Sequence, residues 1–255
     1  MEIFLKMPPP LIILGVFFSI IMLLQILKSI IKGYMNGVIG QFILVIRDNK
    51  GYFVLGLIIV ISMIFMLDKP ISLFCQKFYN MHFYTDVDFI SSCGEGWFVF
   101  GILCLFLTIF QVFNQVNGVV LTRISLISGV YAGLLNGILK FILNRQRPSI
   151  GIDPLVFFHF FIKGGGKIGD LIYAYNSMPS GHTITVVAVI TPLFMHTKNK
   201  LLKLLIAIIP VLELFSRVYT LNHWASDVTL ATLLGVFVGI ATYNANQIYF
   251  VKSKS

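Results

Sequence analysis

Long apolar runs, separated by short polar connections, constrain the fold of this chain more than any other feature. A helix needs roughly 20 apolar residues to cross a bilayer. Seven segments approach that length: 11–31, 52–67, 97–113, 119–143, 181–197, 201–220 and 227–245. Of the 255 residues, 57% are hydrophobic and 11% are charged, whereas a soluble domain is about 25% charged. The sequence therefore predicts an all-α fold, a polytopic membrane helix bundle with about seven spans.

The N-terminal part of the chain is expected to differ from the rest. Segment 11–31 is long for a signal peptide and has no small-residue cleavage site, so we interpret it as a span. Residues 34–46, "YMNGVIGQFILVI", are too short for another span and are expected at the membrane interface. We therefore predict an N-terminal span and interfacial segment over 1–51, followed by one membrane domain of six spans over 52–255.

The net charge and the cysteines exclude several classes of function. The net charge of +9 is scattered between apolar runs and forms no basic block, so no nucleic-acid partner is expected. Cys75, Cys93 and Cys104 are odd in number and contain no CxxC pair. They are expected to be free thiols and to form no metal site. The alternative is a disulfide between Cys75 and Cys93, if their loop lies outside the cell.

The first polar segment that suggests chemistry is "KFILNRQRP", with Lys140 and Arg147-Pro148. Seven residues correspond to about two helical turns. The two cations are thus expected on one face, where the fourth predicted span leaves the membrane. The alternative is a basic helix end that only reaches toward the lipid headgroups.

The second segment is "MPSGH", Met178 to His182, which opens the fifth predicted span. Ser180 is a favourable N-cap residue, and the start of a helix offers free N–H groups and a positive dipole end to an anion. His182 would lie in the first turn. The alternative is an ordinary cap beside an incidental histidine.

The third segment is "SRVYTLNHWASD", Ser216 to Asp227, between the last two predicted spans. His223 and Asp227 share a face if the turn between them is helical. A carboxylate on one imidazole nitrogen fixes the tautomer and leaves the other nitrogen free to attack. Glu213, four residues before Arg217, is expected to be a structural partner of that arginine. The alternative is a structural His–Asp pair with an arginine at the membrane surface.

Alternation of the seven spans places all three segments on one side of the membrane. Three cations and backbone amides suit a tetrahedral dianion, and two histidines suit a nucleophile and a general acid. Asp227 is the one candidate acid, so no carboxylate cluster is available for Mg²⁺. We therefore predict a phosphoryl-transfer site that uses no metal and no cofactor. The spacing alone leaves open which histidine attacks.

The three segments together resemble the signatures of a known family. The patterns K-x6-RP, PSGH and SR-x5-H-x3-D occur in order and without substitution. They are similar to the three motifs of the type 2 phosphatidic acid phosphatase superfamily. The resemblance covers roughly residues 52–245, a six-helix phosphatase core, and leaves segment 11–31 outside it.

The resemblance implies a role for each motif residue. His223 would be the nucleophile that forms a phosphohistidine, and Asp227 would orient it and stabilise its positive charge. His182 would protonate the leaving oxygen and later activate water. The phosphoryl oxygens would be held by Lys140, Arg147, Arg217, Ser180 and the amide of Gly181.

The expected substrate is a membrane lipid phosphate or pyrophosphate. The site would open at the bilayer surface, and the preceding loop contains the apolar run "LVFFHFFI", residues 155–162. Candidates are bacterial envelope lipids: phosphatidylglycerophosphate, phosphatidic acid, undecaprenyl pyrophosphate and lipid A. Two other functions stay open, a lipid phosphotransferase that uses the same site and a non-catalytic membrane scaffold or transporter. The sequence does not indicate an oligomeric state.

The distribution of positive charge predicts which side of the membrane carries the site. Ten Lys and Arg residues fall on the opposite side and nine on the side of the motifs. Without the three motif cations the balance is ten to six, and cytoplasmic loops carry the excess of positive charge. We therefore expect a multi-pass protein of the inner (plasma) membrane. Its site would face away from the cytoplasm, toward the periplasm in a Gram-negative cell.

Overall fold

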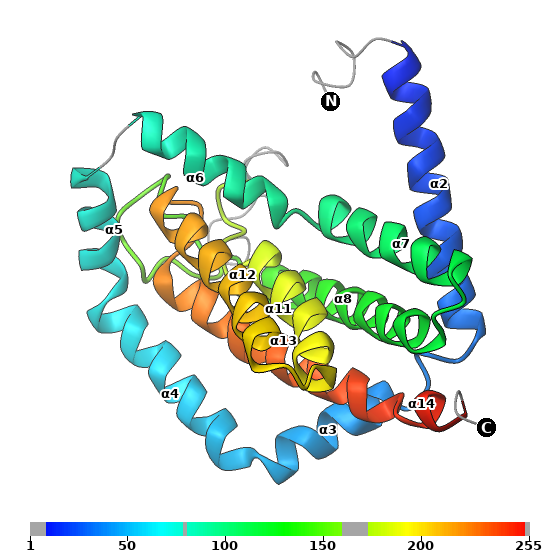
Figure 1. Ribbon diagram of the computed structural model, residues 1–255. Coiled ribbons are helices and arrows are strands. Elements are labelled where there is room, and N and C mark those ends of the chain that lie inside the picture. The colour runs from blue at the N-terminus through cyan, green and yellow to red at the C-terminus, as the bar shows by residue number, and fades with distance from the viewer. Residues whose placement is uncertain (1–8, 79–80, 160–172, 253–255) are drawn as a thin grey trace.

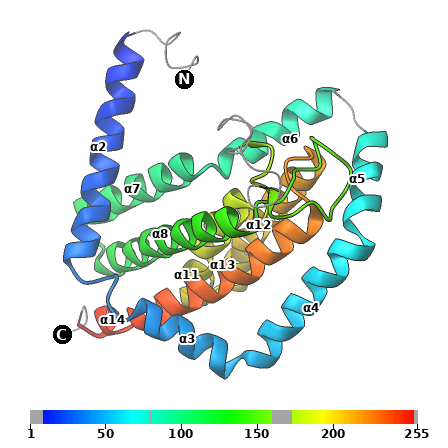
Figure 2. The same ribbon diagram turned by 180° about the vertical axis from the view of Figure 1, so that it is seen from behind.

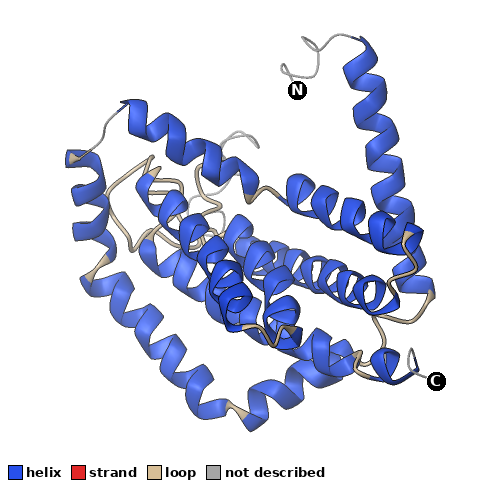
Figure 3. Ribbon diagram, in the orientation of Figure 1, coloured by secondary structure: helices blue, strands red, loops and turns tan. Residues whose placement is uncertain are grey.

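The computed structural model describes residues 9–78, 81–159 and 173–252, and these residues form helices joined by loops (Figures 1 and 3). No strand occurs in these three ranges. The helices are α2 (Pro9–Ile31), α3 (Val38–Asp48), α4 (Lys50–Met66), α5 (Asp68–Lys77), α6 (Met81–Cys93), α7 (Gly96–Val112), α8 (Val116–Leu143), α11 (Gly181–His196), α12 (Lys200–Tyr219), α13 (Ala225–Ala245) and α14 (Ile248–Lys252). The predicted all-helical class is confirmed.

Each of the seven predicted spans corresponds to one helix, and every boundary lies within three residues of its expected position. These helices are α2, α4, α7, α8, α11, α12 and α13. Long apolar runs fold this way because, in hydrocarbon, the backbone polar groups must be satisfied within the segment itself.

Fewer helices than seven meet a strict criterion for crossing a membrane unaided. Among the described residues, α8 and α13 are long and apolar enough, and the number rises to four if two bent pairs each form one span. The pairs are α3 with α4, bent by 83°, and α6 with α7, bent by 54°. Helices α4, α7 and α11 have 17, 17 and 16 residues, and α12 carries four charged side chains. The helices are therefore established, and a crossing by all seven stays a prediction.

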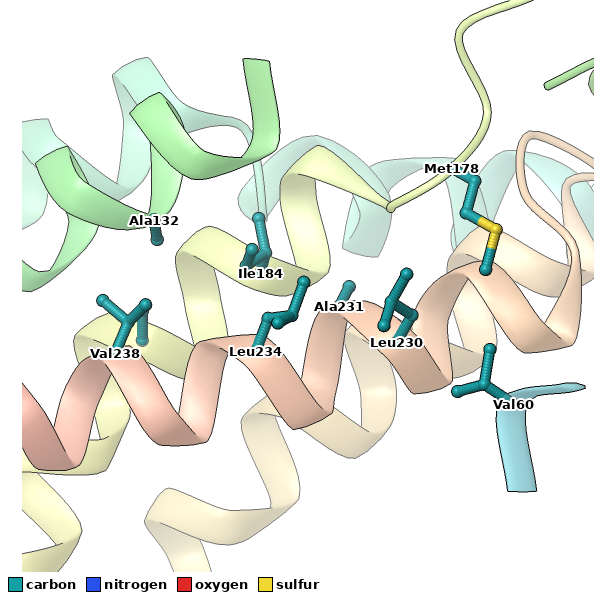
Figure 4. Close-up of a cluster of buried hydrophobic side chains, with 9 residues drawn as sticks. Val60, Ala132, Met178, Ile184, Leu230, Ala231, Leu234 and Val238 are labelled. Carbon is teal, nitrogen blue, oxygen red and sulfur yellow. The ribbon is translucent and has the colours of Figure 1, made fainter. Parts of the chain in front are cut away.

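The core of the bundle is built on α8, α11 and α13, with α11 packed against both of the others. Figure 4 shows the main cluster, in which Ala132 of α8, Ile184 of α11 and Leu234 of α13 point toward one another. In Figure 1 α12 lies in front of these helices, and in Figure 2 α8 does. Helix α4 packs along α13 and α7 packs along α8.

The segment before residue 51 packs against the core at several points, through α2, Tyr34 and α3, but one part of it projects away. Val45 of α3 packs against Phe237 and Ala241 of α13. The N-terminal half of α2 projects away from the other helices (Figures 1 and 2). Residues 34–46, expected at the interface, belong largely to α3, which runs at a steep angle to α4.

The sequence did not predict helices between segments 52–67 and 97–113, yet α5 and α6 occupy that stretch. They are short and carry polar residues, so hydropathy alone reads them as a connection. All three cysteines are free thiols, as expected. The first residue of α5, Asp68, is completely buried and pairs with Arg145 near the site described below.

Candidate active site

The three polar segments meet at one end of the bundle. Hydrogen bonds join them directly: the Ser180 amide donates to the Asp227 carbonyl at 3.3 Å, and the Trp224 indole donates to the Gln146 carbonyl at 2.7 Å. Lys140 and Gly181 are also neighbours, because a Cβ atom on Gly181 would lie 3.8 Å from the Lys140 ammonium. The structure thus brings the C-terminal end of α8, the start of α11 and the α12–α13 connection together.

Lys140 and Arg147 do not share a helical face, so that expectation was wrong. Helix α8 ends at Leu143, and Asn144 follows in the left-handed conformation with φ 39°. Asparagine tolerates this conformation and commonly ends a helix. Arg147 instead lies in the loop that follows the helix, within electrostatic range of Lys140.

Lys140 and Arg147 both contact the loop before α11, and Arg147 also contacts the α12–α13 connection. Lys140 Nζ donates to the Asn176 carbonyl at 2.8 Å. Arg147 Nε donates to the Tyr173 carbonyl at 2.7 Å, and the guanidinium lies 4.4 Å from the centroid of the Tyr173 ring. Arg147 Nη1 also donates to the Asn222 carbonyl at 3.3 Å. These partners are neutral acceptors, and neither side chain forms an ion pair among the described residues.

Ser180 occupies the N-cap position of α11, as predicted, but its hydroxyl does not cap the helix. It accepts a hydrogen bond from the Thr183 hydroxyl at 3.0 Å. The first N–H groups of any α-helix lack intrahelical partners. The N–H groups of the first turn, beginning with Gly181, therefore keep their capacity to bind an anion beside Lys140.

Arg217 and Glu213 are both buried near the end of α12, with 6% and 3% of their surface exposed. Arg217 Nη1 donates to the Ser91 hydroxyl of α6. Glu213 lies against Gly94, where a Cβ atom would collide with its carboxyl group. No ion pair within 4.0 Å joins Glu213 and Arg217 among the described residues. The hydrogen-bond partner of Arg217 is therefore Ser91, and Glu213 is only a neighbour of the arginine.

His223 is held by a backbone carbonyl. Its Nδ1 lies 2.6 Å from the Ser177 carbonyl oxygen and 3.7 Å from Asp227 Oδ2. A carbonyl oxygen can only accept, so Nδ1 carries the proton and Nε2 holds the lone pair. Asp227 Oδ2 in turn accepts from the Ser177 hydroxyl at 2.5 Å and from the Trp224 amide at 2.9 Å. Ser177 thus lies between the histidine and the aspartate that sequence spacing paired directly.

The surroundings of His223 favour a neutral ring. Burial lowers the pKa of His223 well below its usual value, and the positive charges of Arg217, Lys140 and Arg147 lower it further. The same three cations lie within electrostatic range of His182. The three predicted cations therefore lie close enough to both histidines to influence their charge, and His223 keeps an unprotonated Nε2 in its neutral form.

Sequence reasoning missed the residues that support this arrangement from behind. Ser177 and the buried pair Asp68 and Arg145 all contact or bridge to Asp227 or His223. One signal existed for the pair: an ionisable residue at the edge of an apolar run is expensive and usually paired. Which partner each charge would find depends on how α5 packs, and the sequence does not contain that information locally.

An open groove of about 540 Å³ lies beside the loop that follows α8. It is lined by Ile64, Phe65, Lys69, Ile152, Asp153, Pro154 and Leu155. None of the predicted site residues lines it. The predicted apolar loop continues through residues 160–162, which lie outside the described residues.

Comparisons with known proteins identify the family and support the fold. A family model described as the PAP2 superfamily matches residues 118–249, which contain all three motifs. No curated protein sequence matches the chain significantly.

Two solved structures share the fold. A transmembrane PAP2-type phosphatidylglycerolphosphate phosphatase from Bacillus subtilis is 20% identical, with a TM-score of 0.59. The match covers 80% of this chain and 95% of that one. LpxE from Aquifex aeolicus is 21% identical with a TM-score of 0.51, and the match covers 71% and 96%. At these identities the similarity establishes the fold alone. The family match spans more than half of the chain, so the protein belongs to the PAP2 superfamily, the type 2 phosphatidic acid phosphatases that its motifs resemble.

Proposed function

We propose that this protein is a membrane lipid phosphate phosphatase that works through a phosphohistidine on His223. The observation that carries the proposal is the meeting of the three motif segments, which brings Lys140, Arg147 and Arg217 near His182 at the start of α11 and near His223 in the α12–α13 connection. The charge of these cations matches a phosphoryl dianion. We assign the chemistry to residues 52–255, with residues 1–51 as an additional N-terminal segment.

In the proposed first step, His223 Nε2 attacks the phosphorus atom. The bond between phosphorus and the lipid oxygen breaks as a P–N bond forms, and His182 gives its proton to the leaving oxygen. Lys140, Arg147, Arg217, Ser180 and the Gly181 amide hold the phosphoryl oxygens. Electrostatic stabilisation of this kind is often the largest single contribution to catalysis.

In the proposed second step, water replaces the lipid. His182 takes a proton from water, the resulting hydroxide oxygen bonds to phosphorus, and the P–N bond breaks. Inorganic phosphate and neutral His223 result, so atoms and charge balance. Nδ1 keeps its proton throughout and donates it in a hydrogen bond to the Ser177 carbonyl. Asp227 Oδ2, 3.7 Å from Nδ1, stabilises the positive charge that develops on the ring.

The substrate that we propose is a bacterial envelope lipid, reached from the bilayer. Apolar residues dominate the outward faces of the helices and line the groove beside the loop after α8. The description of the Bacillus subtilis structure names phosphatidylglycerolphosphate, which we place first among the candidates. Phosphatidic acid, undecaprenyl pyrophosphate and lipid A complete the set.

Phosphate release from purified protein in detergent tests this function. The panel contains the four lipids, with a soluble ester such as glycerol 3-phosphate for comparison. We expect release from at least one lipid and much slower release from the soluble ester. Consumption of lipid phosphate without an equal amount of inorganic phosphate would instead identify a phosphotransferase. An inactive wild-type protein across the whole panel would refute the phosphatase assignment and favour a non-catalytic role.

A further inference from the structure

A buried ionic network lies behind the site, on residues that none of the three motifs includes. Arg145 Nη2 donates to Asp68 Oδ2 at 2.6 Å, and Arg145 Nη1 donates to Asp227 Oδ1 at 2.5 Å. All three side chains are completely buried. One guanidinium thus bridges two carboxylates from separate helices, α5 and α13.

The network also fixes the first turn of α13. Asp68 Oδ1 accepts a hydrogen bond from the Ser226 amide at 2.9 Å, and Asp68 Oδ2 accepts from the Ser226 hydroxyl at 2.5 Å. Arg145 Nη1 donates to the same hydroxyl at 2.7 Å. Carboxylates are favourable at helix N-termini because they satisfy free N–H groups and oppose the dipole. Asp68, which belongs to α5, therefore caps the N-terminus of α13. The capped amide, that of Ser226, lies three residues after His223.

Arg145 has no donor left for a substrate. Its Nε and Nη2 donate to the Pro154 carbonyl at 3.1 and 2.8 Å. The guanidinium also lies 4.8 Å from the centroid of the Phe157 ring and 5.3 Å from that of Trp224. Lys140 and Arg147, by contrast, hold mostly backbone carbonyls. Arg145 is thus a support for the site and differs from the phosphate-binding cations.

A continuous chain of contacts leads from this network to the nucleophile. Arg145 occupies one oxygen of Asp227, which leaves the other oxygen for the Ser177 hydroxyl and the Trp224 amide. The Ser177 carbonyl then holds His223 Nδ1. A shift of Asp227 would therefore move both the residue after His223 and the group that orients its ring.

We infer that Asp68 and Arg145 are a positioning pair, which sets the orientation of His223 through Asp227 and the first turn of α13. This inference rests on the proposed function. It predicts that the pair governs the rate of the chemical step and leaves substrate binding to the motif cations. Displacement of a reacting group by about 1 Å can cost on the order of 100-fold in rate.

The test compares Asp68→Asn, Arg145→Lys and Arg145→Met with a control on another ion pair. Arg47 and Asp48 form an exposed pair at 3.0 Å, with side chains 68% and 60% exposed, so Arg47→Met and Asp48→Asn provide matched changes of charge. For the lipid that the wild type hydrolyses, we expect kcat to fall about 100-fold in Asp68→Asn and Arg145→Met. We expect KM to change by less than about threefold, because such a pattern marks an interaction made in the transition state.

Conservative replacement separates positioning from mere stability. Arg145→Lys keeps the charge and one carboxylate contact, so it should recover kcat at least about tenfold over Arg145→Met. If Arg145→Met does not fold, Asp68→Asn and Arg145→Lys carry the comparison. Variants that melt at lower temperature but keep kcat within about twofold of the wild type would overturn the inference.

A second readout does not need turnover, so it stays informative even if no lipid in the panel is hydrolysed. Orthovanadate is a tetrahedral oxyanion that can bond to a nucleophile. It is added stepwise to the protein in a Trp97→Phe background, and binding is followed by the fluorescence of Trp224. We expect Asp68→Asn and Arg145→Met to weaken vanadate binding at least about tenfold, by loss of the bond to a well-placed His223. Unchanged vanadate affinity in both variants would refute the positioning role.

Discussion

At the scale of single residues, the state of His223 is determined by its neighbours. The ring is 1% exposed, its Nδ1 proton is bound by a carbonyl, and burial with nearby cations lowers its pKa. The proposed attack on phosphorus requires this neutral imidazole with a free Nε2. A protonated His223 would have no lone pair on that nitrogen.

His223→Ala should abolish phosphate release while the protein still folds and inserts. His223 lies in the α12–α13 connection, and loss of a covalent nucleophile usually costs several orders of magnitude, here at least about 1,000-fold. Phosphate release in detergent, with size-exclusion elution as the folding check, measures this. His196→Ala, at the far end of α11, is the matched control and should stay active. More than about a tenth of wild-type activity in His223→Ala would remove His223 as the nucleophile.

Activity should survive an excess of EDTA. The oxygens of Asp227 already accept from Arg145, Ser177 and Trp224, so this carboxylate is committed within the protein. Magnesium sites generally use one or more free carboxylates. Phosphate release is measured after dialysis against EDTA, and complete loss that added Mg²⁺ restores would mean that the proposed mechanism is wrong.

At the scale of helices, close packing of α11 on α13 holds the two histidine-bearing segments in register. Gly235 and Gly239 of α13 form a GxxxG pattern that faces α11. A Cβ atom on Gly239 would lie 2.4 Å from Thr191 Cβ and 3.0 Å from the Ala188 carbonyl. Small residues at such spacing let two membrane helices approach closely. Neither contact can move without a shift of the α11 backbone.

Gly239→Ala should therefore destabilise the protein by about 1–3 kcal/mol, the usual cost of overpacking a filled interface. Gly137→Ala is the matched control, because nothing lies within 4 Å of a Cβ atom at that position in α8. It should change the unfolding free energy by no more than about 0.5 kcal/mol. Thermal unfolding in one detergent compares the two, and equal melting temperatures would contradict the packing described for α11 and α13.

At the scale of the whole molecule, the site occupies one end of the bundle. Most of the Lys and Arg residues outside the motifs are expected at the other end. Helices α8, α11, α12 and α13 run between these ends (Figure 1). The positive-inside rule applied to the ten-to-six balance supports a site outside the cytoplasm. The enzyme would then act on lipid phosphates of the outer leaflet of the inner membrane.

Single cysteines test this orientation in a background without Cys75, Cys93 and Cys104. Ser149→Cys lies in an exposed part of the loop after α8, and Lys198→Cys lies in the exposed connection between α11 and α12, at the opposite end. On cells permeable only at the outer membrane, an impermeant thiol reagent should label Ser149→Cys and spare Lys198→Cys. The reverse pattern would place the site, and its substrate, on the cytoplasmic leaflet.

The sequence by itself determined the helical class, the seven apolar helices and the membership of the family. Apolar runs must fold as helices in a bilayer because no water satisfies their backbone, and this requirement is local. The motif residues could also be recognised locally, because Lys140, Arg147, His182, Arg217, His223 and Asp227 occur at fixed spacings.

The tertiary structure alone decided how those residues are held. Helical periodicity predicted one face for Lys140 and Arg147, but Asn144 ends α8 between them. Spacing paired His223 with Asp227, yet the Ser177 carbonyl, 46 residues away, accepts the hydrogen bond from Nδ1. Asp68 of α5 and Arg145 of the loop after α8 are 77 residues apart and meet only because both pack beside the first turn of α13. Buried polar groups take whichever partner satisfies them, and which partner is near depends on long-range packing that no local pattern encodes.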